Sequence, residues 1–376
     1  MLQGKFYTRL GDVADAPGVK TISMEDLHER NERRKEIAEK LGQPDKVPFM
    51  VDALGNFLAG FAGVDQLDYH LNPEVMMKAQ LKARERFWGL IWGTVAPDFG
   101  VALEPSLIGG KVVWRKDQAP IAVQSFDLGD ADRVQVKKPR EVDVIVKALE
   151  TYEYFKKNAP EGVSVDFHGA VLGPIDTSAL VTGIPIFMES LYRKPQVIHR
   201  LLDKVTDALI SLAELQFEVT GKPRRFSVND DYAGHLSPKM FREFVIPYVR
   251  RIYEILPSDT VRWFHSDGTQ IDPCLELLPE MGVQVFHSFT FKVDLASAKA
   301  RIGNSVCLSG NINPIDVIRN GSPGSVLHAC HEAIRKAAAG GGYILEAGGE
   351  LGRGTPCENI DAMIMAALEY GSYPIE

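Results

Sequence analysis

Short apolar runs alternate with longer helical patterns along the second half of the chain. From about residue 160, six runs rich in β-branched and aromatic residues are separated by stretches with the spacing of amphipathic helices. The runs span 163–170, 225–233, 261–268, 283–289, 306–312 and 343–349. Parallel strands need a crossover connection, usually a helix, so this alternation predicts a parallel sheet covered by helices.

The stretches between these runs carry helix-ending signals at the expected places. They read KPQVIHRLLDKVTDALISLAELQFEVTG, SPKMFREFVIPYVRRIYEIL and GSVLHACHEAIRKAAAGG. Ser237 followed by Pro238 is typical of an N-cap and a first helical residue, and Gly340 to Gly342 close the last stretch. These signals support helices as the crossover connections of the sheet.

More sheet is predicted upstream, in VPFMVDAL and GKVVWRK. Together with the six later units, this favours an α/β fold of the (β/α)8 TIM-barrel type over a doubly wound sheet. We expect a single catalytic barrel domain over residues 46–376. Residues 1–45 read as an N-terminal helical lead-in, because SMEDLHERNERRKEIAEKLGQ combines helical spacing with dense mixed charge, as in a solvated helix.

Composition narrows the classes of partner. Of the 376 residues, 45% are hydrophobic and 24% are charged, which is ordinary for a globular protein. The net charge of -8 argues against nucleic acid as a partner, because phosphate binding needs clustered Lys and Arg. The four cysteines form no Cys-x-x-Cys pair, and we find no signal-type apolar core or membrane-length run. We therefore expect a cytoplasmic chain without membrane association.

Polar residues gather at the carboxyl ends of the predicted strands. In a parallel α/β fold these ends and the following loops build the active site. The repeated placement of His, Asp, Asn and Glu there is therefore a functional signal. The residues concerned are His168, Asn229, Asp230, Asp231, His265, Asp267, His287, Asn311, Glu346 and Glu350.

His265 and Asp267 are the strongest candidates among them. They are separated by one residue, so in an extended segment both side chains point to the same side. This spacing suits two ligands of one metal ion, or a histidine oriented by a carboxylate. The alternative is a loop in which the aspartate caps the next helix, and the neighbouring polar strand ends favour function.

The acidic residues of two other strand ends come next. Asp230 and Asp231 are adjacent and point opposite ways on a strand, so we expect at most one to face the site as an acid. A turn or helix cap before Ser237 is an equal alternative for this cluster. Glu346 and Glu350 bracket the glycines of EAGGE and are candidate metal ligands together with His265 and Asp267.

The remaining polar strand ends are candidates for substrate binding. Asn229, His168, His287 and Asn311 form this set, although single histidines in apolar runs more often serve the core or satisfy hydrogen bonds. The aromatic stretch LKARERFWGLIWGTVAPDF contributes mostly to packing, with one or two rings as candidates for an apolar pocket. No Gly-x-Ser-x-Gly elbow, P-loop or His-Glu-x-x-His motif occurs, and GELGRGTP lacks the context of a dinucleotide fingerprint.

From about residue 30 onward, the chain resembles the uroporphyrinogen decarboxylase superfamily. The resemblance lies in FHSDG, LLPEMGVQVFHSFTFKVDLASAKARIG, VCLSGNINPIDVI and GGGYILEAGGELGRGTPCENIDAMIMAALEY. It extends to Gly173-Pro174, to LSPKMFREFVIPY and to the lead-in NERRKEIAEKLGQPDKVPF. The superfamily includes decarboxylases and corrinoid-dependent methyltransferases, and the resemblance implies a (β/α)8 barrel with its funnel at the carboxyl ends of the strands.

Departures from the family patterns bear on the function. The decarboxylases carry an Arg-rich N-terminal signature, and GKFYTRLGDVADAPG has nothing similar. The thiol-methylating methyltransferases bind zinc through a His-x-Cys-Gly motif and a second cysteine. Here the first motif reads His265-Ser266-Asp267-Gly268, and Gly349 stands at the position of the second cysteine. Cys357 lies beyond that position.

The resemblance and these departures together predict a methyltransferase of the O-demethylase type. An oxygen- and nitrogen-rich site, with zinc as a candidate cofactor, suits assistance to a leaving oxygen. The methyl group of a small methylated substrate, with aromatic ethers preferred, would pass to the cobalt of a corrinoid (cobalamin). A separate corrinoid carrier protein is implied, because this chain has no Asp-x-His-x-x-Gly motif. The alternatives are a methylcorrinoid-to-thiol or -pterin methyltransferase, a uroporphyrinogen decarboxylase, and a non-catalytic binding barrel.

Overall fold

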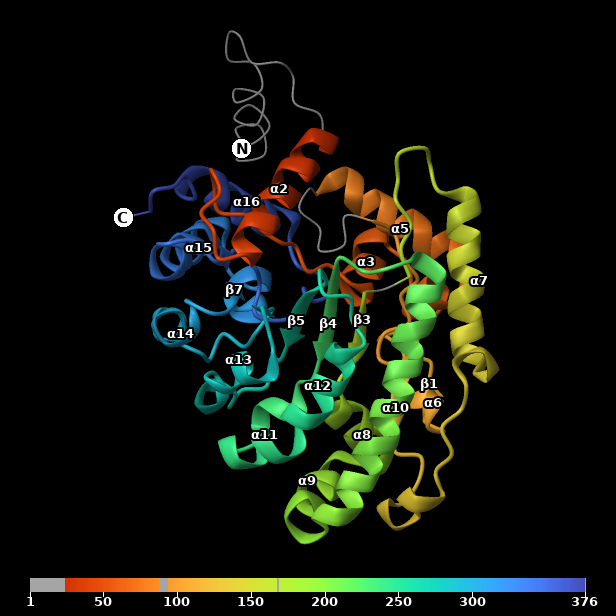
Figure 1. The fold of residues 1–376 in the computed structure, drawn as a ribbon. Coiled ribbons are helices and arrows are strands. Elements are labelled where there is room, and N and C mark those ends of the chain that lie inside the picture. The colour runs from red at the N-terminus through yellow and green to blue at the C-terminus, as the bar shows by residue number, and fades with distance from the viewer. Residues whose placement is uncertain (1–23, 88–93, 168, 376) are drawn as a thin grey trace.

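A parallel sheet ringed by helices forms the centre of the molecule (Figure 1). The computed structural model describes residues 24–87, 94–167 and 169–375. His168, Trp88 and Trp92, which the sequence raised as candidates, lie outside these described residues.

The strands of this sheet follow one another in chain order and all pair in parallel. Two further segments extend the sheet at its edges, because Phe49 pairs in parallel with Leu345 and Val95 with Val165. The predicted (β/α)8 barrel is thereby confirmed. The regular strands are β3 (Ala170–Leu172), β4 (Arg225–Asn229), β5 (Val261–His265), β6 (Val285–His287), β7 (Cys307–Ser309) and β8 (Tyr343–Ile344).

Helices precede the barrel and connect its strands. Those before β3 are α2 (Met24–Glu39), α3 (Gly55–Ala62), α4 (Gln66–Leu71), α5 (Pro73–Arg86), α6 (Leu103–Leu107) and α7 (Asp143–Asn158). Those between β3 and β5 are α8 (Pro174–Thr182), α9 (Ile184–Arg193), α10 (Pro195–Thr220), α11 (Pro238–Phe244) and α12 (Ile246–Glu254). The later ones are α13 (Leu277–Met281), α14 (Leu295–Ile302), α15 (Pro323–Ala337) and α16 (Cys357–Tyr370).

The segment GKVVWRK does not join the barrel, which corrects the expectation that it adds to the same sheet. It forms β1 (Lys111–Val113), which pairs antiparallel with β2 (Ile121–Val123) in a separate two-stranded sheet. The connection between them is too short for a crossover, so only a hairpin can form. The upstream run VPFMVDAL does contribute to the barrel, through Phe49.

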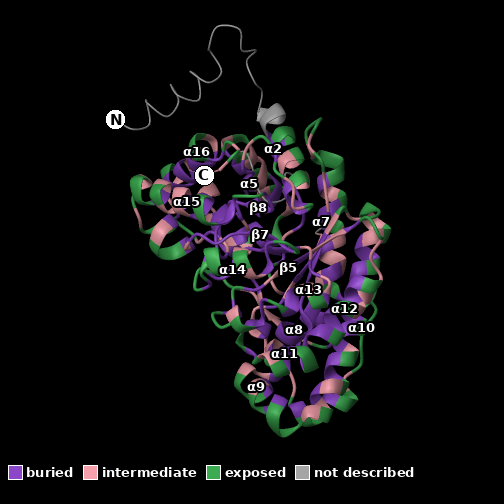
Figure 2. Ribbon diagram, turned by 60° about the vertical axis from the view of Figure 1, so that its left-hand side comes forward, coloured by how far each residue is buried: buried purple, intermediate pink, exposed green. Residues whose placement is uncertain are grey.

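Alternating residues of the strands face the helices and the barrel interior. Phe264, Phe286 and Leu308 belong to the main core that the helices share. Their neighbours Trp263, Val285 and Cys307 form a second small cluster with Met50 and Ile344. Since side chains alternate along a strand, this second cluster is the apolar filling of the barrel itself. Figure 2 shows the buried centre and the exposed outer faces of the helices.

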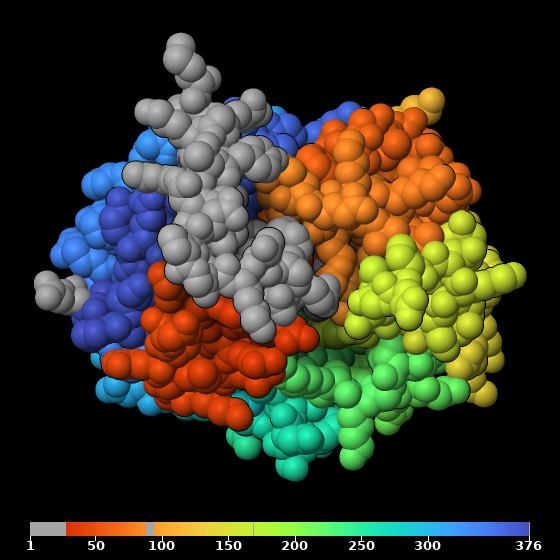
Figure 3. All heavy atoms as spheres, turned by 90° about the horizontal axis from the view of Figure 1, so that it is seen from above, coloured from red at the N-terminus to blue at the C-terminus, as the bar shows by residue number. Residues whose placement is uncertain are grey.

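The lead-in helix α2 is more than a solvated helix, which corrects its sequence interpretation. Asn31 accepts from the backbone N–H of Phe49 at 3.1 Å and donates to its carbonyl at 2.8 Å. Lys35 and Glu39 are buried, and Glu39 pairs with Arg225 at the start of β4. The helix therefore covers the amino-terminal ends of the strands, the face shown in Figure 3. The dense charge of the sequence did not reveal this burial, because buried Lys35 pairs with Glu32 of the same helix and buried Glu39 with Arg225 of β4.

The predicted helix after β4 is confirmed but divided in two. Ser237 caps α11 by accepting from the backbone N–H of Met240, as its Ser-Pro signal predicts. The helix ends at Phe244, and α12 begins at Ile246 with Pro247 in its first turn. Proline lacks the backbone donor that a continuous helix would need there.

Candidate functional site

The carboxyl ends of four neighbouring strands place polar residues at one level of the barrel. In the register of the sheet, Asn229 lies beside His265, His265 beside His287, and His287 beside Ser309. The level below is mostly apolar, with Trp263, Val285 and Cys307 in register on β5 to β7 and Ser227 beside Trp263 on β4. The polar level therefore lies at the carboxyl ends of the strands, the end at which TIM barrels build their active sites.

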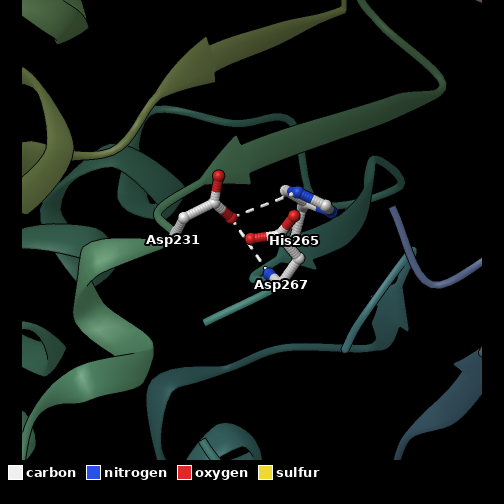
Figure 4. A group of neighbouring side chains, drawn as sticks. All are labelled: Asp231, His265 and Asp267. Atoms are coloured by element: carbon white, nitrogen blue, oxygen red, sulfur yellow. Dashed lines mark hydrogen bonds and ion pairs between the residues drawn. The ribbon is translucent and has the colours of Figure 1, made fainter. Parts of the chain in front are cut away.

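Three side chains converge at this end: Asp231, His265 and Asp267 (Figure 4). His265 Nε2 lies 3.2 Å from Asp231 Oδ1, and the same oxygen accepts from the backbone N–H of Asp267 at 3.0 Å. The ring's other nitrogen, Nδ1, lies 3.2 Å from the carbonyl oxygen of His287 and donates to it. His265 is thus held from both sides, at the end of β5, with Asp267 exposed beside it.

The charges of Asp231, His265 and Asp267 shift one another's pKa values. Burial favours a neutral His265, but Asp231 and then Asp267 outweigh it and raise the pKa of His265 to about 10. Burial raises the pKa of Asp231, yet His265 lowers it more, so the net direction is downward. Burial and the Asp231 carboxylate both raise the pKa of Asp267. Asp267 therefore holds a proton to higher pH than an ordinary aspartate, while Asp231 stays ionised beside the imidazolium.

The same three residues could hold a metal ion. Their ligand atoms all lie within 4.8 Å of one another. Nδ1 of His265 donates to a carbonyl, which leaves Nε2 as the metal-facing nitrogen in the arrangement common to zinc sites. One nitrogen and two carboxylates fit zinc with an open position. Of the predicted ligands, the structure groups His265 and Asp267 with Asp231, and Glu346 and Glu350 are not in this group.

Asp230 points away from the group and has a structural position. It is fully buried and accepts from the backbone N–H groups of Ile175 at 3.2 Å and Asp176 at 2.9 Å, at the start of α8. Burial raises its pKa to about 7 and raises that of the adjacent Asp176, so the two carboxyls share a proton. Gly173 leaves room for it, since a Cβ there would lie 2.2 Å from Asp230 Cγ. The expectation that one of the two adjacent aspartates faces the site holds for Asp231.

Asn229 and His287 are joined in a hydrogen-bonded chain below the group. Ser227 Oγ donates to Asn229 Oδ1 at 2.6 Å and lies 2.9 Å from His287 Nε2. Because the single hydroxyl proton goes to Asn229, His287 Nε2 must be the donor to Ser227. Burial, and then the charge of His265, lower the pKa of His287 to about 3. His287 is therefore neutral and positions its neighbours.

A buried pair of carboxyls lies next to this chain. Ser288 Oγ donates to Asp52 at 3.0 Å, and the Ser288 backbone N–H donates to Glu346 at 3.1 Å. Ser309 donates a further 2.6 Å hydrogen bond to Glu346. Burial and mutual repulsion raise the pKa of Asp52 to about 6, and burial raises that of Glu346 to about 7. Sequence reasoning missed Asp52 and Ser288, although Asp52 ends the run VPFMV in the same way that other acids end their strands.

Glu350 and Asn311 are engaged by the loops around the site. Glu350 accepts from the backbone N–H of Asn56 at 3.3 Å and from its side chain at 3.2 Å, near the start of α3. Burial, then Asp52 and Asp98, raise its pKa to about 8. Asn311 donates to the carbonyls of Thr290 at 3.1 Å and Val293 at 2.9 Å, so its amide is used to hold the loop after β6.

Part of the aromatic stretch before β3 lies in the core, and the rest lies outside the described residues. Phe87 and Phe99 are buried in the main core, which confirms the packing interpretation for them. Trp88 and Trp92 lie outside the described residues, as does His168. In the part of the chain that the structure describes, no helix is both long and apolar enough to cross a membrane.

A barrel with converging acid and imidazole groups at the carboxyl ends of its strands is the arrangement of TIM-barrel enzymes. A family model described as Uroporphyrinogen decarboxylase (URO-D) matches residues 30–370. The chain belongs to this family, and the family resemblance expected from its motifs is confirmed at this level.

Individual relatives are more distant. The uroporphyrinogen decarboxylase of Trichodesmium erythraeum is 29% identical over 183 residues, which cover 48% of this chain and 49% of that protein. The uroporphyrinogen decarboxylase of Hordeum vulgare is 29% identical over 175 residues, covering 45% and 50%. The chain thus spans about half the length of these curated relatives. A solved methyltransferase from Methanosarcina mazei superposes with a TM-score of 0.74 at 20% identity, covering 90% of this chain and 98% of that one, and shows the shared fold.

Proposed function

We propose that the chain removes a methyl group from a methylated small molecule and delivers it to the cobalt of a corrinoid held by a separate carrier protein. The observation that carries the proposal is the Asp231–His265–Asp267 group at the barrel mouth. All its donor atoms are oxygen or nitrogen, and Asp267 stands where the resemblance places a cysteine in thiol-methylating relatives. The likeness of the fold to a methyltransferase supports the same reaction class.

The cysteines support an oxygen-directed site over a thiolate-directed one. Cys274, Cys307 and Cys330 are buried, and burial raises the pKa of each thiol. Cys357 is partly buried, starts α16 and is absent from the converging group. At Gly349, where a second cysteine was expected, a Cβ would lie 3.5 Å from Asp267 Oδ2. This position faces the site, and here it carries no sulfur.

Asp267 is suited to give the leaving oxygen its proton. An alkoxide or phenolate leaves poorly unless it is protonated or held by a cation. In the proposed step the methyl carbon–oxygen bond breaks with its electron pair left on oxygen, and the methyl group passes to the reduced cobalt. The oxygen takes the proton of Asp267, a carboxyl whose pKa is raised by burial and by the Asp231 carboxylate. Asp231 and His265 position Asp267 through its backbone N–H and their charges.

A zinc ion is the alternative means of assistance at the same place. When bound by His265, Asp231 and Asp267, it would supply Lewis-acid stabilisation of the leaving oxygen. In that form the carbonyl of His287 keeps the His265 ring in orientation through Nδ1–H. Buried Ser227, itself hydrogen-bonded to Asn229, holds His287 in place.

The substrate class is a small methylated oxygen compound. The preference for an aromatic ether came from the upstream aromatic stretch, and Phe87 and Phe99 pack in the core. That preference therefore no longer has support from these two rings. The exposed side of Asp267 leaves the mouth open to a donor and to a carrier protein.

Decarboxylation is the second candidate, because the curated relatives carry that activity in their names. The mouth argues against it. A substrate rich in carboxylates needs cationic partners, whereas the imidazolium of His265 is already paired with Asp231 and Asp267 adds no positive charge. Neither transfer from a methylated corrinoid to a thiol or pterin nor ligand binding without catalysis would use Asp267 as a proton donor.

One assay separates these candidates. The purified chain is mixed with reduced cobalamin and a panel of methyl ethers, alcohols and amines, and the absorbance change on cobalt methylation is followed. Donor-dependent methylation supports the proposal, and a matched reaction without the chain is the control. Carbon dioxide release from a porphyrinogen with no methylation would establish the decarboxylase alternative.

A further inference from the structure

A cavity lies at the end of the barrel opposite the Asp231–His265–Asp267 group. Its volume is about 210 Å3, and it reaches inward from the segment joining α10 to β4 as far as Ser227 and His287. In Figure 3 this segment lies beside α2 on the amino-terminal face. The lining residues are Asp166, Gly169, Gln216, Phe217, Thr220, Lys222, Pro223, Arg224, Arg225, Ser227, Trp263 and His287.

Two buried donors at the inner wall have no protein partner among the described residues. One is Nε1 of Trp263, a residue only 5% exposed, and the other is Nη2 of Arg225. The guanidinium of Arg225 lies over the Trp263 ring, 5.6 Å from its centroid. Its Nε and Nη1 are taken by Glu39 and Glu32, so Nη2 is the nitrogen left over. A buried donor without a partner is costly, so these two donors favour binding of a ligand that supplies acceptor atoms.

An unpartnered acceptor lies on the same wall. Gln216 uses its Nε2 to donate to the Ala170 carbonyl at 2.9 Å, and its Oε1 has no partner in the described part of the chain. Ser227 Oγ lies at the inner end and belongs to the hydrogen-bonded chain of Asn229 and His287. A matching ligand therefore offers acceptor oxygens to Trp263 and Arg225 and a hydroxyl to Gln216.

The charge of the lining sets the sign of the ligand. Lys222, Arg224 and Arg225 face one lining acid, Asp166. Arg224 and Arg225 are paired with Glu36, Glu39 and Glu32 of α2 behind them, so the two arginines add no net positive charge. Lys222 has no acid partner among the described residues, and this cation together with the two unpartnered donors favours a small anion. The volume exceeds the roughly 30 Å3 share of one water several-fold, yet lies below the usual size of a drug-like pocket.

We propose that this cavity binds a small oxyanion that also carries a hydroxyl group, such as hydrogen phosphate or a short hydroxycarboxylate. The anion reaches Trp263 Nε1 and Arg225 Nη2 after a small turn of these side chains, with Lys222 at the opening. Trp263 stands two residues before His265 on β5, and His287 contacts both the cavity and the His265 ring. The site is independent of the methyl-transfer proposal.

Direct binding measurements test the site without any turnover. The full chain is titrated calorimetrically with inorganic phosphate, glycolate, sulfate and acetate in an otherwise anion-poor buffer. Phosphate and glycolate are expected to saturate one site per chain. Sulfate and acetate lack the hydroxyl proton for Gln216 and are expected to bind about tenfold more weakly, equal to about 1.4 kcal/mol. Which of the two favoured anions binds tighter distinguishes a phosphate source from a carboxylate source.

Variants place the binding in this cavity. Trp263→Phe and Lys222→Ala should each weaken phosphate binding at least about tenfold, with the melting temperature recording whether the fold is kept. Trp114→Phe and Lys239→Ala, which alter residues away from the cavity lining, are the matched controls and should bind as the parent does. Absence of saturable binding by phosphate and glycolate, or unchanged binding in both cavity variants, overturns the proposal. Neither result depends on the methyl-transfer assay.

Discussion

His265 and Asp231 face each other across neighbouring strand ends, with Nε2 and Oδ1 3.2 Å apart. The opposite edge of the ring donates to the His287 carbonyl, so both nitrogens carry protons when no metal is bound. One carboxylate therefore fixes the charge of the imidazole and, through the Asp267 backbone, the place of the acid beside it. Several expectations follow from this arrangement and from the helix beneath it.

Replacing the proton donor should remove activity without removing the fold. Asp267→Asn keeps the size and the backbone hydrogen bond to Asp231 but cannot donate an acidic proton. We expect methyl transfer to fall by roughly 10²- to 10⁴-fold, the usual contribution of a general acid. The rate is measured with the best donor of the panel. Asp259→Asn, an exposed aspartate outside the site, is the matched control, and full activity in Asp267→Asn would exclude the role.

The ion pair should make stability depend on pH in a defined window. The folded pKa of His265 is about 10 against an ordinary 6.5, so its contribution is complete below about pH 6.5 and is lost as the pH rises through about 10. In the metal-free protein, the free energy of unfolding should fall by a few kcal/mol across this range. Urea unfolding at a series of pH values measures it.

Asp231→Asn removes the cause of that shift. The fall in unfolding free energy between about pH 6.5 and pH 10 should shrink in this variant, while Asp259→Asn keeps the slope of the parent. An unchanged slope in Asp231→Asn would show that another group titrates there.

The two adjacent aspartates should separate stability from activity. Asp230→Ala leaves the backbone N–H groups of Ile175 and Asp176 without their buried acceptor, at a cost of about 1–3 kcal/mol in unfolding free energy. Asp231→Ala should lower activity by removing the partner of His265, and it also loses the contribution of that ion pair to stability, whereas Asp230→Ala should leave the His265–Asp267 group in place. Denaturant unfolding and initial rates are compared for both variants. The reverse pattern would contradict the assignment.

Metal analysis distinguishes the two forms of assistance. If zinc is the assistant, the protein should bind about one ion per chain, and His265→Gln should lose it. Elemental analysis of the purified protein and competition with a chelator provide the measurement. His331→Gln, a histidine stacked on Tyr370 away from the mouth, is the control and should retain the metal. Full activity after complete chelation would assign the assistance to proton transfer from Asp267.

The lead-in helix should be required for stability through one buried charge. Glu39 has a side chain 2% exposed and pairs with Arg225, so Glu39→Ala should cost about 3 kcal/mol by leaving that guanidinium partly unpaired. Glu36→Ala removes an exposed partner of Arg224 from the same helix and should cost less than about 1 kcal/mol. Equal losses in the two variants would mean that α2 is held by other contacts.

The alternation of apolar runs and helical stretches was enough to predict the barrel, because the period of hydrophobic residues follows local backbone geometry. The same locality explains the Ser237 cap and the long α10. It also accounts for the wrong placement of GKVVWRK in the barrel sheet. The β character of this segment is a local property, whereas the short connection to β2 decides which strand it pairs with. The solvated interpretation of α2 failed because the helix packs on the barrel, where buried Glu39 pairs with Arg225, a residue far along the chain.

For the site, the sequence by itself determined which residue types stand at the strand ends, and it singled out His265 and Asp267. Only the tertiary structure decided which residues surround them. It brought Asp231 to the ring and turned Asp230 under α8. It also buried Asp52 against Ser288, and it used Asn311 and Glu350 to hold loops. The physical reason is that side-chain type is local, whereas distance, burial and hence protonation arise when separate strands meet at one end of a closed sheet.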